Sequence, residues 1–134
     1  MTAPVLADTS AWVEYLRGTG SRVHLELRRL IAEEAPVATT EVVVLELLAG
    51  ASDDEELTRL SRLLGRFELL PVEGLADYDA AAELYRRCRR AGETVRKLTD
   101  CLIAAVAIRA GAALLYRDQD FDVIARHAPL RVVG

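Results

Sequence analysis

The 134-residue sequence contains little cysteine, few aromatic residues and no long hydrophobic run. Its two cysteines, Cys88 and Cys101, belong to no close cluster of cysteine or histidine, which favours a reduced, cytoplasmic protein. The first residues lack the basic and apolar regions of a signal peptide. The longest uncharged apolar run, CLIAAVAI at 101–108, is far shorter than the roughly 20 residues of a membrane-spanning helix, so we expect a buried helix and no membrane association.

Several sequence motifs of catalysis are also missing. The chain has no GxSxG, no P-loop, no GxGxxG and no HExxH, so no protein nucleophile or nucleotide-binding loop is indicated. His24 and His127 have no partner at the spacing of metal ligands. We therefore expect both histidines to be surface residues and not ligands.

What the sequence does contain is the composition of a globular protein, with 51% hydrophobic and 28% charged residues. At this length, and without a repeat or a linker, we expect residues 1–134 to form one domain. The net charge of −4 argues weakly against a nucleic-acid partner. The charge is unevenly distributed, however, because RRCRRAGETVRK at 86–97 carries six basic side chains against one glutamate.

This basic segment has two interpretations. It attracts phosphates by charge, or it is simply a solvated helix face. The four arginines between 86 and 90 cannot all point the same way on a helix. Arg96 and Lys97 lie closest in sequence to Asp100, and are the better candidates for contacting a nucleic acid or orienting carboxylates.

Short apolar runs alternate with helical patterns along the chain. We expect a buried strand at 4–7, further strands at 36–40, 68–72 and 112–116, and an edge strand at 130–133. Helical patterns lie at 22–35, 41–49, 57–67, 76–91, 99–110 and 118–128. This alternation predicts an α/β domain with a mostly parallel central sheet and helices on both faces. In such sheets the functional crevice lies beyond the carboxyl ends of the strands.

Four acidic residues are predicted to lie at this rim. Asp8 follows the first strand and Asp118 follows the fourth, while Asp100 and Glu46 lie near the beginnings of helices that start from the same side. Each acid also has a local explanation. Asp8 can cap a helix, Asp100 can favour a helix dipole, the RDQDFD segment can form a capped turn, and Glu46 can pair with an arginine.

Glu46 is the least ordinary of the four, because apolar residues of VVVLELLAG at 42–50 surround it on nearly every side. An unpaired buried carboxylate costs several kcal/mol or takes up a proton. Carboxylates that converge on one rim repel each other unless a cation neutralises them, and an all-oxygen ligand set suits Mg²⁺ or Mn²⁺ better than Zn²⁺. We therefore expect Glu46 to face a metal site and not to have an arginine of its own chain as its main partner.

Four stretches resemble one protein family in their order and spacing: DTSAW at 8–12, VVVLELLAG at 42–50, TDCLIAA at 99–105 and YRDQDFD at 116–122. Over essentially its whole length the chain resembles PIN-domain ribonucleases, specifically VapC-type toxins of bacterial type II toxin–antitoxin pairs. The resemblance implies a three-layer α/β/α fold. It also implies cleavage of RNA that depends on Mg²⁺ or Mn²⁺, with one or two ions.

The resemblance further implies roles for individual residues. The family's catalytic and metal-binding acids match Asp8, Glu46, Asp100 and Asp118, and Asp120 matches a further metal-binding acid. Which of the three aspartates in RDQDFD completes the site stays open between Asp118, Asp120 and Asp122. Ser10, or alternatively Thr9, matches a small hydroxyl residue that helps bind metal-bound water or phosphate.

The partners that the resemblance implies are a VapB-type antitoxin and an RNA substrate. Members of the family are commonly homodimers that form hetero-oligomers with a cognate antitoxin, whose tail occupies the catalytic groove. Their targets are structured RNAs, often tRNA and sometimes ribosomal RNA. The stretch at 53–67 fits either a core-facing helix or a surface for such partners.

Two other functions compete with this one. Asp8 after the first strand also suits a phosphatase of the haloacid-dehalogenase type, but such enzymes usually need a second aspartate where this chain has Ser10. The other competitor is a catalytically silent module that dimerises, binds an antitoxin and helps to repress its operon. The intact set of acids argues against a silent module.

Overall fold

The structure is a computed structural model, and it describes residues 3–133. Within this range five strands form one sheet in the order β3-β2-β1-β4-β5, and every neighbouring pair is parallel. The strands are β1 (Val5–Ala7), β2 (Val37–Thr39), β3 (Glu68–Leu69), β4 (Ala113–Leu115) and β5 (Arg131–Val132). The α/β fold with a parallel sheet is confirmed, and so is the edge strand at the end of the chain.

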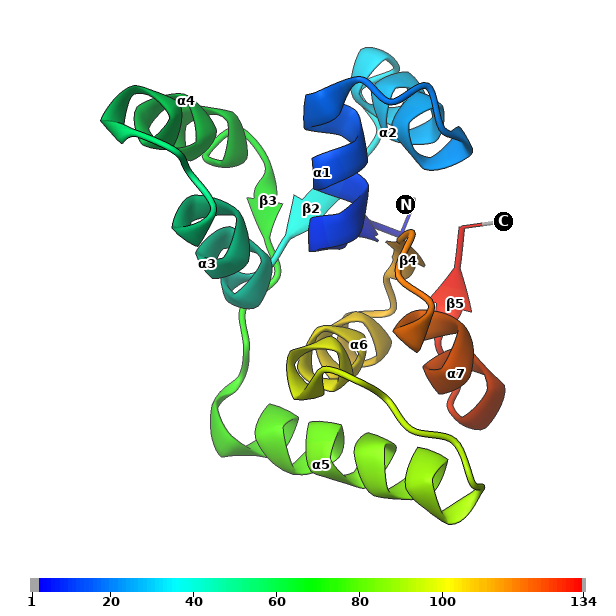
Figure 1. Cartoon of the computed structure of the whole chain (residues 1–134). Helices are drawn as coiled ribbons and strands as arrows, with labels where there is room; N and C mark the ends of the chain where they lie inside the picture. The colour runs from blue at the N-terminus through cyan, green and yellow to red at the C-terminus, as the bar shows by residue number, and fades with distance from the viewer. Residues whose placement is uncertain (1–2, 134) are drawn as a thin grey trace.

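Seven helices connect these strands within residues 3–133. They are α1 (Thr9–Arg17), α2 (Arg22–Ala32), α3 (Glu41–Ala49), α4 (Asp54–Leu64), α5 (Gly74–Arg90), α6 (Leu98–Ala110) and α7 (Asp120–His127). Figure 1 shows α1 and α2 on one side of the sheet and α5 and α6 on the other. This three-layer arrangement follows from right-handed crossovers. The chain steps from β1 to β2 in one direction and from β4 to β5 in the other, so its helices cover opposite faces.

The change of direction also fixes where a site can form. β1 lies between β2 and β4, so the chain leaves the carboxyl ends of β1 and β4 toward opposite sides of the sheet. A crevice opens at such a point in parallel sheets. Asp8 directly follows β1, and Asp118 follows β4 after two residues.

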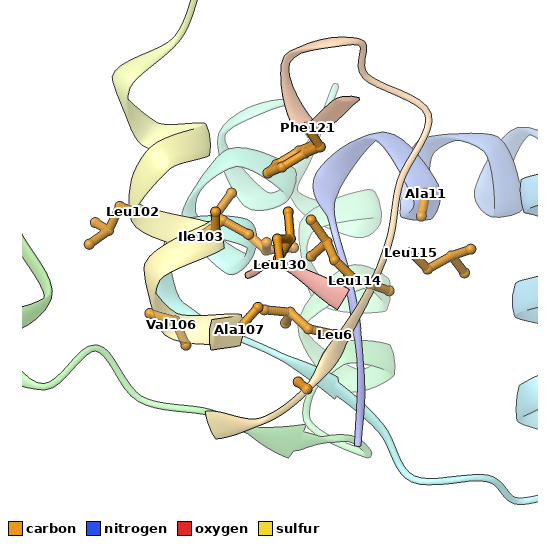
Figure 2. Close-up of a cluster of buried hydrophobic side chains, with 14 of the residues drawn as sticks. Leu6, Ala11, Leu102, Ile103, Val106, Ala107, Leu114, Leu115, Phe121 and Leu130 are labelled. Atoms are coloured by element: carbon orange, nitrogen blue, oxygen red, sulfur yellow. The ribbon is translucent and has the colours of Figure 1, made fainter. Parts of the chain in front are cut away.

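One part of the core lies between the sheet and helices α6 and α7, and the same buried cluster also includes Trp12 of α1, Leu27 of α2 and Val43 of α3. Leu6 of β1 and Leu114 of β4 belong to the same buried cluster as Ile103 of α6 and Phe121 of α7 (Figure 2). The predicted buried helix is confirmed, since every residue from Cys101 to Ala107 is buried. Its many small side chains allow α6 to fit between the sheet and α5 (Figure 1). Within residues 3–133 no helix has the length and apolarity needed to cross a bilayer.

Some predicted boundaries differ from those in the structure. The strand expected at 68–72 is shorter, because the chain turns away from the sheet and the N–H of Val72 donates to the Glu41 carboxylate at 2.9 Å. The helix expected at 76–91 begins at Gly74 and ends at Arg90.

A buried ion pair fixes α5 against the far end of α6. The Arg109 guanidinium donates to Asp77 from Nε at 3.0 Å and from Nη2 at 3.0 Å, and Nη2 also donates to the Pro71 carbonyl at 2.6 Å. Asp77 is 3% exposed, and the Arg109 hydrogen bond is the main cause that lowers its pKa. The pair therefore holds the helix whose opposite end carries Asp100.

We expect Asp77→Asn to destabilise the protein by about 2–3 kcal/mol, because it leaves a partly buried guanidinium without its counter-charge. The midpoint of thermal unfolding should fall by roughly 5–10 °C. Differential scanning calorimetry beside Asp79→Asn, an exposed acid on the same helix, measures this difference. Equal midpoints for the two variants would contradict the assigned role of the pair.

Candidate active site

Five acidic side chains gather at the carboxyl ends of β1 and β4. Three of them, Asp100, Asp118 and Asp120, each offer a carboxylate oxygen within 4.8 Å of the other two. Asp8 lies beside them, since its charge raises the pKa of Asp100. The charge of Glu46 in turn raises the pKa of Asp8, so Glu46 also lies near this group. We call the five acids the acidic row, and Glu46 is not part of the tight group of three.

Three of the acids lie at the beginnings of helices. Asp8 is the N-cap of α1, and its Oδ2 accepts the N–H of Ser10 at 3.0 Å. Asp100 lies in the first turn of α6, and Asp120 is the first residue of α7. The local explanations of Asp8 as a helix cap and of Asp100 as a first-turn charge therefore hold alongside the clustering. Helix beginnings at the carboxyl rim carry these acids because positive helix ends favour negative charge.

Glu46 receives a hydroxyl, not a basic side chain, as its partner. Thr9 Oγ1 donates to Glu46 Oε1 at 2.6 Å, across 37 residues of sequence. No salt bridge among residues 3–133 includes Glu46, in agreement with the prediction that no arginine of its own chain is its main partner. The α3 helix is thus tied to the start of α1 at the acidic rim.

Ser10 connects the two strand ends. Its Oγ donates to Asp8 Oδ2 at 2.6 Å, and it accepts the N–H of Arg117 at 2.9 Å and of Asp118 at 3.3 Å. One hydroxyl therefore holds the residues after β1 and those after β4 in a fixed relation. The sequence predicted a role for this hydroxyl near metal-bound water or phosphate, and the contacts of Ser10 lie within the acidic row itself.

The loop between α5 and α6 closes one end of the row. The backbone N–H groups of Arg96 and Lys97 both donate to Asp120 at 3.1 Å. The Arg96 side chain contacts Asp120 and Asp118, and Lys97 Nζ lies 3.1 Å from Asp118 Oδ2. These two basic residues orient carboxylates, which was one of the two roles expected from their position in the sequence.

The acids differ sharply in how easily they ionise. Burial raises the pKa of Asp8, and the hydrogen bonds from Ser10 only partly offset it. Burial, a hydrogen bond with Asp120 and the charge of Asp8 raise the pKa of Asp100 to about 8. Burial acts in the same direction on Asp120, but hydrogen bonds from Asp100 and the 96–97 backbone lower its pKa overall. The row as a whole therefore resists holding all its charges without a cation.

Two buried oxygens in the row have no hydrogen-bond partner among the described residues, Asp8 Oδ1 and Asp100 Oδ2. Buried polar atoms are normally paired, so two unpaired carboxylate oxygens among these acids are consistent with a ligand that binds there. Oxygen is the atom that hard divalent cations such as Mg²⁺ and Mn²⁺ prefer. The residues present fit a divalent metal ion, with ligands from β1, α6 and the β4–α7 segment.

Arginines of the basic segment and His127 have partners of their own away from the acidic row. On α5, Arg90 pairs with Glu83 at 3.0 Å and Arg89 lies over the Tyr85 ring, so this part of the basic segment is a solvated helix face. His127 is not isolated as expected, because it and Arg126 pair with Glu93 of the loop that carries Arg96. Sequence spacing offers no signal for this pairing across 34 residues.

Two kinds of comparison place the chain among known proteins. Residues 5–127 match the PIN domain family. The chain is 55% identical to ribonuclease VapC11 of Mycobacterium tuberculosis over 131 residues, which is 97% of this chain and 98% of that protein. It is also 35% identical to ribonuclease VapC51 of the same organism over 96 residues, covering 71% of this chain and 69% of that protein.

The fold is similar to that of solved toxin structures. VapBC2 from Rickettsia felis, bound to a DNA fragment from its promoter, gives a TM-score of 0.76 at 21% identity and covers 97% of both chains. VapC20 of Mycobacterium tuberculosis, described as a sarcin-ricin loop cleaving toxin, gives a TM-score of 0.63 at 24% identity. The match covers 95% of this chain and 98% of that one. At these identities the similarity shows a common fold alone.

Proposed function

The chain belongs to the PIN-domain family and to its VapC group, and we propose that it is a metal-dependent endoribonuclease, the toxin of a VapBC toxin–antitoxin pair. The observation that carries the proposal is the row of acids at the carboxyl rim, in which Asp8 and Asp100 each keep a buried oxygen without a partner. We further propose that residues 1–134 form a single PIN domain, which the family match over 5–127 supports.

We assign the catalytic and metal-binding roles to Asp8, Glu46, Asp100 and Asp118, with Asp120 as a further metal-binding residue. Mg²⁺ is the proposed ion and Mn²⁺ its substitute, as one ion or two. When bound there, such an ion polarises the phosphodiester, lowers the pKa of water and stabilises negative charge on the leaving oxygen. No nucleophilic side chain is required, in keeping with the motifs that the sequence lacks.

The protein's own residues prepare the site for this chemistry. Ser10 fixes the position of Asp8 relative to the Asp118 backbone, because its hydroxyl hydrogen-bonds to both. Thr9 orients Glu46 through a hydrogen bond to its carboxylate. Arg96 and Lys97 bring positive charge to Asp118 and Asp120, and the same groups can receive a phosphate when an ion takes up the carboxylates. Attack by water on the phosphorus should leave a 5′-phosphate and a 3′-hydroxyl.

The substrate and the partners belong to the same proposal. We propose a structured RNA, tRNA or ribosomal RNA, as the substrate, a cognate VapB-type antitoxin as the partner, and a homodimer that forms a hetero-oligomer with it. An RNA substrate places the activity in the cytoplasm. Support comes from the VapC ribonucleases that the chain resembles and from structural neighbours that are VapBC complexes.

The test is RNA cleavage by the purified protein with Mg²⁺ or Mn²⁺, with and without EDTA. We expect Asp8→Asn and Glu46→Gln to lower the cleavage rate about a hundredfold or more, and EDTA to abolish cleavage reversibly. Asp79→Asn and Glu55→Gln are matched controls, because they make the same replacements at exposed positions away from the rim. Both controls should cleave at the wild-type rate.

Full activity of Asp8→Asn or Glu46→Gln, or cleavage in EDTA, would overturn the assignment of the metal site. A wild-type protein that leaves both a tRNA pool and total RNA intact would contradict the ribonuclease proposal. That result would favour the catalytically silent antitoxin-binding module. The ends of the products give an independent check, since a cyclic phosphate would exclude direct attack by water.

A further inference from the structure

A hollow of about 540 Å³ lies beside the acidic row, at the carboxyl ends of β4 and β5. Arg22 of α2, Tyr116 and Arg117 of the segment after β4, and Asp122 of α7 all line it. We call it the side hollow. Its lining residues come from the start of α2, from the segment after β4, from α7 and from the residue after β5. None of these four side chains belongs to the tight group of acids.

One short segment links the side hollow to the acidic row. Tyr116 lines the hollow and Asp118 belongs to the group of acids, and two residues of extended chain span at most about 7 Å. The segment is fixed from both sides. Ser10 accepts the N–H groups of Arg117 and Asp118, and Arg117 Nη1 donates to Glu14 Oε1 at 2.8 Å. If the phosphate of one nucleotide of an RNA strand lies at the acids, the adjacent nucleotide is therefore close enough to enter the side hollow.

Arg22 is the most informative residue of the side hollow. It is exposed, and it takes part in no salt bridge or hydrogen bond among residues 3–133. It is also the first residue of α2, where the positive end of the helix disfavours a cation. Ser21 already caps this helix end by accepting the N–H of His24. The guanidinium of Arg22 is therefore the group that attracts an anion here, and phosphate is the anion that a nucleic acid supplies.

The opposite wall of the hollow suits a base. The Tyr116 ring is half-buried, packs against Phe121 with ring centroids 5.3 Å apart, and donates its hydroxyl to Asp122 Oδ1 at 2.6 Å. The Asp122 carboxylate oxygens can accept further hydrogen bonds, and the amino group of a base is a donor that fits them.

We propose that the side hollow is a subsite for one nucleotide next to the cleaved phosphate, with Arg22 on its phosphate and Tyr116 and Asp122 against a base that carries an amino group. This inference rests on the proposed ribonuclease function, and it names residues that set substrate affinity and sequence preference without taking part in the cleavage step. Unpaired bases splayed against aromatic side chains are the usual mode of sequence-dependent RNA recognition.

The first test measures binding without cleavage. On an Asp8→Asn background, fluorescence anisotropy follows a labelled single-stranded RNA of mixed sequence, about 12 nucleotides long. Arg22→Ala should weaken binding about fivefold and reduce the slope of log affinity against log salt by about 0.7, the value for one lost phosphate contact. Arg28→Ala is the matched control, because Arg28 is exposed and without a salt bridge on the same helix but does not line the hollow.

The second test uses the cleaving protein. Sequencing the ends of fragments from the mixed RNA should show a base preference at one position beside the cut, which Asp122→Asn changes and Arg28→Ala does not. Equal affinities of Arg22→Ala and Arg28→Ala, or a preference that Asp122→Asn leaves intact, would overturn the subsite. A wild-type protein that binds RNA through Arg22 but never cleaves it would sink the proposed function and leave the subsite standing.

Discussion

Asp100→Asn is expected to lower RNA cleavage by roughly 10³-fold while making the metal-free protein more stable at pH 8. Activity falls because the variant removes a carboxylate from the middle of the acidic row. Stability rises because Asp100 is 1% exposed, has an oxygen without a partner, and is ionised only against burial and the charge of Asp8. Asparagine has nearly the same shape, carries no charge, and its amide can donate to Asp120 in place of the proton.

The two opposite effects are measured on one preparation. Single-turnover cleavage gives the rate, and thermal unfolding in EDTA at pH 8 gives a midpoint that should lie several degrees above that of the wild type. Asp79→Asn is the control for stability, because it makes the same replacement at an exposed position of α5. An Asp100→Asn protein that is less stable than the wild type in EDTA would contradict the claim that burial of this carboxylate is costly.

Mn²⁺ is expected to stabilise the wild type, and to do so more strongly at pH 8 than at pH 5. The pKa of Asp100 is raised to about 8 in the folded protein from an ordinary value of 3.8. Between these pH values the folded protein holds more protons than the unfolded chain, so metal-free stability decreases as pH rises through this window. A metal ion binds the ionised carboxylates. It therefore adds most to the stability of the folded protein at a pH where Asp100 has lost its proton.

At a concentration one hundred times its dissociation constant, a ligand adds about 2.7 kcal/mol to the stability of the folded state. For this chain such a gain corresponds to a rise of roughly 6–12 °C in the unfolding midpoint at pH 8. At pH 5 competition with protons should make the rise smaller, and Asp100→Asn should show little rise at either pH. A shift of equal size at both pH values, or in both proteins, would place the ion elsewhere.

The sequence predicts the sheet and the location of the acids because both depend on local patterns. CLIAAVAI is apolar on every side, and it becomes the helix whose residues 101–107 are all buried. Asp8 and Asp118 follow short apolar strands, and parallel pairing of β1 with β4 brings their ends together. The unusual position of Glu46 in an apolar helix also predicts correctly that no basic side chain forms a salt bridge with it within residues 3–133.

Other features depend on contacts between distant segments, which no local pattern contains. The backbone N–H groups of Arg96 and Lys97 reach Asp120 only because the loop before α6 lies over the start of α7. Glu93 fastens the same loop to His127 at the end of α7, so a histidine expected at the surface is half-buried in an ion pair. No sequence pattern marks Arg22 of the side hollow. Its role is inferred from the folded protein, where it lines the hollow and has no hydrogen-bond or salt-bridge partner within residues 3–133.

The central claim is that the row of acids holds a divalent ion, and anomalous X-ray scattering from crystals grown with Mn²⁺ tests it most directly. We predict a peak within coordination distance of oxygens from Asp8 and Asp100, joined by Asp118 or Asp120, with the side chains of Arg96 and Lys97 moved off the carboxylates that bind it. The same crystals of Asp100→Asn should lack the peak. A map without manganese at this rim, with Arg96 and Lys97 still paired to Asp118 and Asp120, would contradict the account.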